Sequence, residues 1–182
     1  MGIVSLEQMR AHLNMETPDP AEDVELQQMI DAADGAIEAF LGVVVAPRTV
    51  TERHIIPPGG MVCLRAVPVI EVTALVASDG STVFDAARVD LDGDLGVLRA
   101  GSSSAVGDVS VSFVAGMNDP PARYELAEML IAAHMWETQR VQTLAQGFSY
   151  GGEDQFQGQF GRGYSLPNRA IQLLGARTPN VP

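Results

Sequence analysis

The spacing of apolar residues changes twice along this chain, from a helical period to an alternating one and back again. Residues 20–41 carry apolar side chains three or four positions apart, which is typical of one face of a helix. Residues 43–116 are rich in valine, threonine and isoleucine instead, and they alternate like a strand near their end. A helical spacing returns in residues 119–146. This order predicts an α+β fold in which an antiparallel sheet is inserted between helices.

Capping signals predict two helices before the sheet. Ser5 and Gln8 form the pattern of a capping box at the start of a short helix over residues 5–14. Asp19 is followed by a proline and, three residues on, by a glutamate, which predicts a second capping box. We therefore expect a second helix over residues 20–41, packed with the first and with the long helix near the C-terminus.

The middle segment, residues 43–116, has the turn signals of several antiparallel strands. Asp-Gly pairs occur at residues 79–80 and 92–93, and the sequence PPGG occupies residues 57–60. Glycine, proline and aspartate in such positions are typical of the tight turns between strands. We predict five or six strands in this segment.

A long helix is predicted over residues 119–146. Asn118 or Asp119 is its expected cap, and the two prolines that follow are expected in its first turn. Its predicted apolar stripe comprises Leu126, Met129, Leu130, Ala133 and Trp136. The predicted core combines Leu126, Leu130 and Trp136 with Leu26, Ile30 and Ile37 of the second helix. Glu125 and Glu128 are predicted to lie on a solvated face.

The chain of 182 residues is acidic, with a net charge of −12 and arginine as its only strongly basic residue. Such a charge argues against holding nucleic acid by its phosphates, because that affinity depends on basic side chains. The single Cys63 excludes an internal disulfide framework. No apolar run reaches the length of a membrane helix, and the start lacks the pattern of a signal peptide. We expect a soluble, cytosolic product.

Residues 147–151 match the G-x-S-x-G pattern and make Ser149 a candidate nucleophile. That motif requires a strand before the serine, a helix after it and a histidine later in the chain. A helix is predicted before it, and His12, His54 and His134 all precede it. We interpret the stretch as a glycine-rich linker, with a small serine hydrolase as the alternative function.

Asp90, Asp92 and Asp94 have the spacing of the first ligands in a calcium loop. The glycine of that loop comes too early here, and Gly101 stands where a bidentate glutamate is required. A turn between two strands is the better interpretation. His134 and the glutamate one turn later lack the second pair that a metal site in a helix bundle needs. We therefore predict no metal, no cofactor and no catalytic residue.

Residues 147–182 are predicted to form a flexible C-terminal arm on a body of residues 1–146. Six glycines and no helical period occur in residues 147–163, and a short helix is expected over residues 167–174. So short a helix is not stable alone in water and needs a surface to lie on. That surface belongs either to a partner or to the chain's own body.

Three stretches in this order resemble the head–tail connector (adaptor, head-completion) proteins of tailed bacteriophages. The start, SLEQMRAHLNME followed by PAEDVELQQMIDAADGAIEAFLG, is similar to the opening of that family. The stretch VSVSFVAGMNDPPARYELAEMLIAAHMWETQR resembles its strand, its "AG" and its proline-started helix. The resemblance covers residues 3–142, together with the "LP" near the C-terminus. The long Gly/Gln/Phe stretch and the absence of lysine depart from the family pattern.

The resemblance implies a structural protein of the virion neck, made in the host cytoplasm, and no enzyme. Family members form a ring, usually of twelve copies, under the portal. The ring extends the DNA channel, through which DNA passes without specific binding, and provides the platform for a stopper or tail-completion protein. Another phage neck or tail-completion protein, or a host-side adaptor domain with the same order of elements, is the alternative.

The C-terminal segments of this family commonly contact the portal, so the resemblance implies a portal contact for the arm. Aromatic and arginine side chains are the usual anchors of interfaces. The candidate contact residues are Phe156, Phe160, Arg162, Tyr164, Leu166, Arg169, Ile171 and Leu174.

Overall fold

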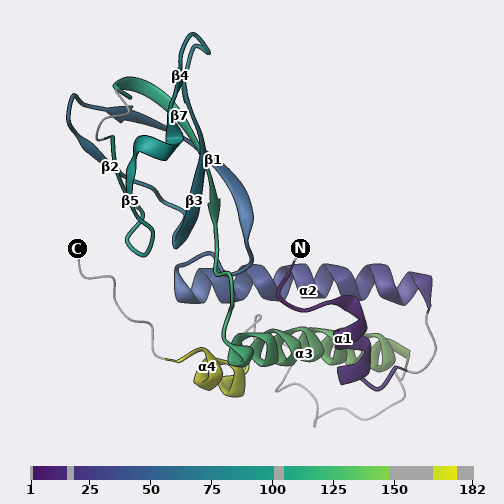
Figure 1. Cartoon of the computed structure of the whole chain (residues 1–182). Coiled ribbons are helices and arrows are strands. Elements are labelled where there is room, and N and C mark those ends of the chain that lie inside the picture. The colour runs from purple at the N-terminus through teal and green to yellow at the C-terminus, as the bar shows by residue number, and fades with distance from the viewer. Residues whose placement is uncertain (1, 16–18, 101–104, 148–165, 176–182) are drawn as a thin grey trace. The chain divides into compact units, whose positions relative to one another are not determined.

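The computed structural model describes residues 2–15, 19–100, 105–147 and 166–175, and these form an α+β fold as predicted (Figure 1). The chain divides into two compact units. The helical unit comprises Met1–Leu41 and Pro121–Pro182, and the β unit comprises Gly42–Pro120. The inserted segment with the strand-like composition is thus a unit of its own.

Helix α1, Leu6–His12, begins as its capping signals predict. The Ser5 hydroxyl accepts a hydrogen bond from the Gln8 N–H at 3.2 Å, and the Gln8 Oε1 accepts one from the Ser5 N–H at 2.8 Å. The capping box is confirmed. Arg10 then forms an ion pair with Asp23 of the next helix, which fastens α1 to that helix.

Helix α2, Pro20–Leu41, has the predicted boundaries. The Asp19 carboxylate caps it by accepting a hydrogen bond from the Ala21 N–H at 2.9 Å. Glu22, expected to complete a capping box, instead forms an ion pair with Arg140. The buried face of α2 consists of Leu26, Met29, Ile30, Ala33 and Ile37, which confirms the three core residues predicted on this helix.

Helix α3, Ala122–Gly147, starts later than predicted. The Pro121 carbonyl accepts a hydrogen bond from the Tyr124 N–H at 2.7 Å, so the two prolines precede the helix and do not lie in its first turn. The side chains it buries most completely are Tyr124, Ala127, Glu128, Ile131, Ala132 and Trp136.

The predicted apolar stripe of α3 is only partly correct. Trp136 is buried as expected, but Leu126 is 40% exposed and Leu130 is half-buried. The helix buries small alanines and a glutamate on the side that touches its neighbours, and small residues allow helices to approach closely. The solvated face predicted for Glu128 is therefore wrong.

Helix α4, Asn168–Leu174, packs against α3 in the helical unit. Ala170 and Leu174 are its buried residues. The sequence left open whether the last helix lies on a partner or on the chain's own body, and in this structure it lies on the chain's own body. Residues 148–165 lie outside the described part of the chain, so the division into a body and an arm stays a prediction.

The β unit contains seven strands in the described residues, one or two more than predicted, and every pairing is antiparallel. One sheet has the order β1-β7-β3-β4, formed by Arg48–Ile56, Gly107–Ala115, Val69–Ala77 and Val83–Phe84. The other has the order β2-β6-β5, formed by Met61–Cys63, Val97–Arg99 and Asp90–Asp92. A short 3-10 helix, Ala86–Arg88, precedes β5.

The two sheets share one hydrophobic core. Alternate residues of β7 enter this core, including Phe113, which is fully buried. The opposite sheet contributes Leu98. The predicted turns at residues 57–60, 79–80 and 92–93 each connect two strands, and these predictions are confirmed. Turn chemistry and alternation thus fix which side of each strand faces the core.

Candidate functional site

The predicted portal-contact residues fall partly on α4. Arg169 is exposed, Leu166 and Ile171 are half-buried, and Leu174 is buried at 2% exposure. Phe156, Phe160, Arg162 and Tyr164 lie outside the described residues. Since Leu174 contributes to packing within the helical unit, it can reach a partner only if α4 leaves α3.

The α2–α3 contact is reinforced by polar groups near the end of the described part of α3. The Arg140 guanidinium lies 4.0 Å from the centre of the Trp136 ring. The same guanidinium forms the ion pair with Glu22 at the start of α2. A stacked arginine that also holds a carboxylate ties the two helices together at this point.

A fully buried glutamate on α3 lies beside a half-buried aspartate on α2, and sequence reasoning missed this carboxyl pair. Glu128 of α3 is fully buried, and neither of its carboxyl oxygens makes a hydrogen bond. Asp34 of α2 also has one buried oxygen, Oδ1, without a partner. A first side-chain carbon built on Gly2 would lie 2.5 Å from Oδ2 of Asp34 and 3.2 Å from Oε1 of Glu128. The N-terminal segment therefore covers both carboxyl groups.

Both pKa values of this pair are raised. Burial and the neighbouring charge of Asp34 raise the pKa of Glu128 to about 8, despite the opposing effect of the Val4 N–H. Burial likewise raises the pKa of Asp34, although the Ile3 N–H opposes the change. The raised pKa favours the protonated form of Glu128 at neutral pH.

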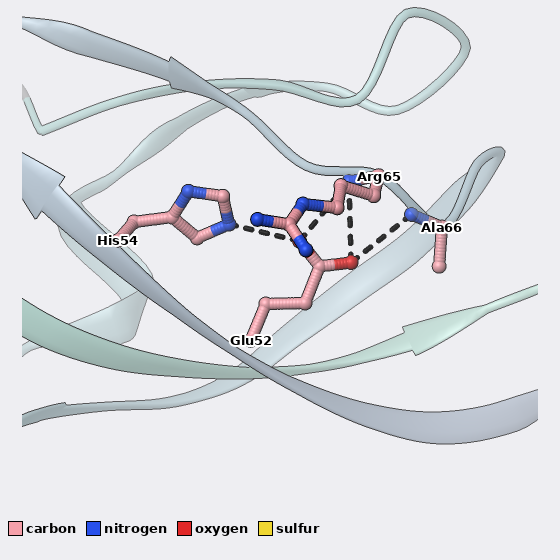
Figure 2. Close-up of polar contacts among 4 residues, drawn as sticks. All are labelled: Glu52, His54, Arg65 and Ala66. Atoms are coloured by element: carbon pink, nitrogen blue, oxygen red, sulfur yellow. Dashed lines mark hydrogen bonds and ion pairs between the residues drawn. The ribbon is translucent and has the colours of Figure 1, made fainter.

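A second glutamate, in the β unit, is nearly as enclosed but well supplied with donors (Figure 2). The Glu52 carboxylate accepts hydrogen bonds from the N–H groups of Arg65, at 3.1 and 3.2 Å, and Ala66, at 3.1 Å. Its Oε2 lies 2.8 Å from Nε2 of His54. Burial raises the pKa of Glu52, but these contacts outweigh burial, and the pKa lies below its ordinary value.

The Glu52 cluster has a structural role that follows from its position. Glu52 and His54 lie on β1, and Arg65 and Ala66 lie in the connection between β2 and β3. The carboxylate thus satisfies two backbone N–H groups of a segment that has no ladder partner at that point.

The solvent face of the four-stranded sheet carries an exposed ion pair. Arg53 on β1 pairs with Asp108 on β7, and Ser78 donates a hydrogen bond to the same carboxylate at 2.7 Å. The Arg53 contact, together with the Ser78 hydrogen bond, lowers the pKa of Asp108 to about 2. Large apolar side chains are also exposed on this unit, namely Ile55, Met61, Val83, Leu95 and Val106.

The candidate calcium loop is a hairpin, as expected. Asp90 pairs with Arg99 across the strands, and Asp92 caps the turn by accepting a hydrogen bond from the Leu95 N–H at 3.2 Å. Within the described ranges, no group of three histidine, cysteine or acidic side chains could hold a metal ion. None of the described helices is long and apolar enough to cross a membrane.

The candidate nucleophile Ser149 lies outside the described residues. The element that leads to it is helix α3, where the hydrolase motif requires a strand. His54 is engaged by Glu52 in the β unit, and His134 is exposed on α3. The described part of the chain assembles no nucleophile with a base.

Solved structures with the same fold come from gene transfer agent (GTA) particles. The chain resembles a protein in the neck of an empty GTA particle computed with C6 symmetry, with 24% identity, a TM-score of 0.61, and coverage of 96% of this chain and 93% of that one. A protein in the virion of a native GTA particle has 24% identity and a TM-score of 0.60, with coverage of 94% and 87%. A protein in the neck of a native GTA particle computed with C12 symmetry has 21% identity and a TM-score of 0.58, with coverage of 97% and 98%.

The sequence comparisons complete the assignment. A search of curated proteins gave no match. The model of the head completion protein family matches residues 2–175, nearly the whole chain, and this confirms the resemblance drawn from three sequence stretches. The chain therefore belongs to the head completion protein family, a family of structural proteins and not of enzymes.

Proposed function

We propose that this chain is a subunit of the neck of a phage-like particle, where it forms a ring between head and tail. The observation that carries this proposal is the family match over residues 2–175. The fold similarity to neck proteins from particles computed with C6 and C12 symmetry supports it. Identical subunits joined by one repeated junction close into a ring when the rotation between them closes.

The ring is proposed to contain twelve copies and to extend the DNA channel below the portal. Each copy carries a net charge of −12, so the channel repels the phosphates of DNA overall. DNA then passes without specific binding, because tight binding to phosphates needs clustered basic side chains. The opposite face of the ring is the proposed platform for a stopper or tail-completion protein.

The portal contact is proposed to lie in the C-terminal segment. Its anchors are the aromatic residues Phe156, Phe160 and Tyr164 with Arg162, followed by the exposed Arg169 of α4. Leu166 and Ile171, both half-buried, adjoin that helix surface. Leu174 keeps α4 on α3, or becomes a further contact if α4 moves to the portal. Twelve such segments acting together give strong attachment even when each contact is weak.

Co-sedimentation with the isolated portal of the same particle tests this contact. The double variant Phe156→Ala/Phe160→Ala is expected to bind at least about tenfold more weakly, as buried aromatic anchors do when truncated. The matched control Gln155→Ala/Gln159→Ala changes two neighbouring side chains and should bind like the wild type. Equal binding by both double variants would exclude the aromatic residues as anchors.

The ring itself is tested by measuring particle mass with and without the portal. We expect a monomeric or weakly associated protein alone, because subunits of charge −12 repel each other at low salt. Addition of portal should give a single large species, and salt should favour it. If the protein does not bind the portal but binds an isolated tail-completion protein, it is a different component of the neck.

A further inference from the structure

The N-terminal segment, the buried carboxyl pair and the two helices that carry it form one local arrangement in the helical unit. The segment runs past α2 into α1 (Figure 1). Val4 is 3% exposed and Met9 is fully buried, so the segment is packed and does not hang free. Gly2 lies so close to Asp34 and Glu128 that no side chain fits there without moving the carboxyl groups.

Two ionised carboxylates do not fit this place. Both oxygens of Glu128 and one of Asp34 are buried without a hydrogen-bond partner. The other side-chain charges that act on the pair are also acidic, namely Glu125 on α3 and Glu38 on α2, whereas the N-terminal amino group acts on Asp34 with the opposite sign. Burying two like charges side by side costs several kcal/mol, which a single shared proton largely removes.

We propose that one proton shared between Glu128 and Asp34 holds Gly2–Val4 against α2 and α3, and that loss of this proton releases the segment. The protonated carboxyl donates a hydrogen bond to the ionised one and so adds a donor to the few that the surroundings offer. The N–H groups of Ile3 and Val4 face the pair from the segment itself. We call this arrangement the carboxyl clamp: a pH-sensitive contact that joins the segment Gly2–Val4 to α2 and α3.

The direction of the response follows from the charges. When the pH rises above the point at which the pair loses its proton, two adjacent negative charges lie under the segment. Opening the segment admits water to both carboxylates and relieves their repulsion. Above that midpoint, the ratio of the doubly ionised to the protonated pair grows tenfold per pH unit, and the open population grows with it.

Carbon-13 NMR of the full chain tests the proton. The Glu128 carboxyl signal, assigned by its loss in Glu128→Gln, should titrate with a midpoint near pH 8. The methyl signals of Ile3 and Val4 should shift with the same midpoint. A Glu128 carboxyl that is already ionised at pH 6 would overturn the proposal.

Two variants separate the clamp from general effects of charge. In Glu128→Gln the amide can donate to Asp34 permanently, so the methyl signals of Ile3 and Val4 should lose the transition that follows Glu128 and keep only the change caused by the N-terminal amino group. Glu137→Gln removes one charge from an exposed position of the same helix and should leave the transition as in the wild type. Wild-type behaviour of the methyl signals in Glu128→Gln would contradict the proposal.

A third variant keeps the proposal testable if Glu128→Gln folds poorly. Asp34→Asn removes the neighbouring negative charge but keeps a group of similar size. The Glu128 midpoint should then fall by about one pH unit or more, as expected for loss of a like charge in contact. An unchanged midpoint would show that the two carboxyl groups share no proton.

Discussion

The helical unit and the β unit each enclose one glutamate, and the two glutamates behave in opposite ways. Glu128 is fully buried without a hydrogen-bond partner, and its pKa rises to about 8. Glu52 has a side chain only 12% exposed, yet its pKa is lowered. Burial raises the pKa in both cases. The donors that face Glu52, and the negative charge of Asp34 beside Glu128, decide the outcome.

The difference reflects what each fold can offer. A loop that leaves a sheet has N–H groups without ladder partners, and Arg65 and Ala66 present theirs to Glu52 (Figure 2). A helix interior has no spare N–H groups, since each is bonded to the carbonyl four residues earlier. The polar groups that face the Glu128 carboxyl therefore come from the N-terminal segment and from Asp34.

The largest expected effect is on the Glu52 cluster. Glu52→Ala leaves two backbone N–H groups and His54 without their acceptor, and we expect the free energy of unfolding to fall by about 2–4 kcal/mol. Glu71→Ala, on an exposed position of β3, should change it by less than about 0.5 kcal/mol. Chemical denaturation at pH 7 measures both. A loss below about 1 kcal/mol for Glu52→Ala would remove the contrast between the two units.

The pH dependence of stability should separate the two glutamates next. The pKa of Glu128 is raised in the folded state, so its contribution to stability is complete below about pH 4.5 and is lost as the pH rises towards 8. The pKa of Glu52 is lowered, so its contribution is lost only as the pH falls below the ordinary range of a glutamate.

Denaturation of Glu128→Gln at pH 5 and pH 8 measures this difference. The wild type should lose at least about 1 kcal/mol more than the variant over that interval, because one pKa unit corresponds to about 1.4 kcal/mol. Glu137→Gln makes the same change of charge on α3 and should keep the wild-type slope. If the free energy of unfolding changes equally with pH in all three proteins, the ionisation of Glu128 does not destabilise the folded state.

Alanine substitutions at two glycines of the helical unit should have smaller effects on stability, and they test how closely the N-terminal segment lies against the carboxyl pair. Gly2→Ala places a methyl group against the carboxyl pair and should cost about 1 kcal/mol, with the cost reduced where the Asp34 side chain can move. Gly35→Ala lies on an open surface of α2 and should stabilise the helix by about 0.5–1 kcal/mol. Thermal unfolding of both variants gives the two signs. A stabilising Gly2→Ala would show that the segment is not held close to the pair.

Sequence reasoning predicted the elements better than the buried polar groups, for a physical reason. Caps and turns depend on neighbouring residues, so the capping box at Ser5 and the turn at residues 57–60 are as predicted. The donors of Glu52 come from 13 and 14 residues further along the chain. The burial of Glu128 depends on α2 and the N-terminal segment together, and a glutamate at helical spacing gives no sign of that.

Dependence on distant residues also explains why the buried face of α3 differs from the predicted one. The sequence prediction placed the leucines inside, whereas the structure buries the alanines, a tyrosine and Glu128. Small residues carry little hydrophobic signal, although they decide how closely α2 and α4 approach. The contact residues predicted in residues 148–165 remain predictions, because those residues lie outside the described part of the chain.

The smallest expected effect tests this face directly. Leu126 is 40% exposed, so Leu126→Ala should lower the free energy of unfolding by less than about 0.5 kcal/mol. Leu130 is half-buried, and Leu130→Ala should cost about 1 kcal/mol, since only part of its side chain leaves an apolar environment. Chemical denaturation of both variants under one set of conditions makes the comparison. A cost above about 2 kcal/mol for Leu126→Ala would return the leucines to the core and move Glu128 towards solvent, and the contrast between the two glutamates would then disappear.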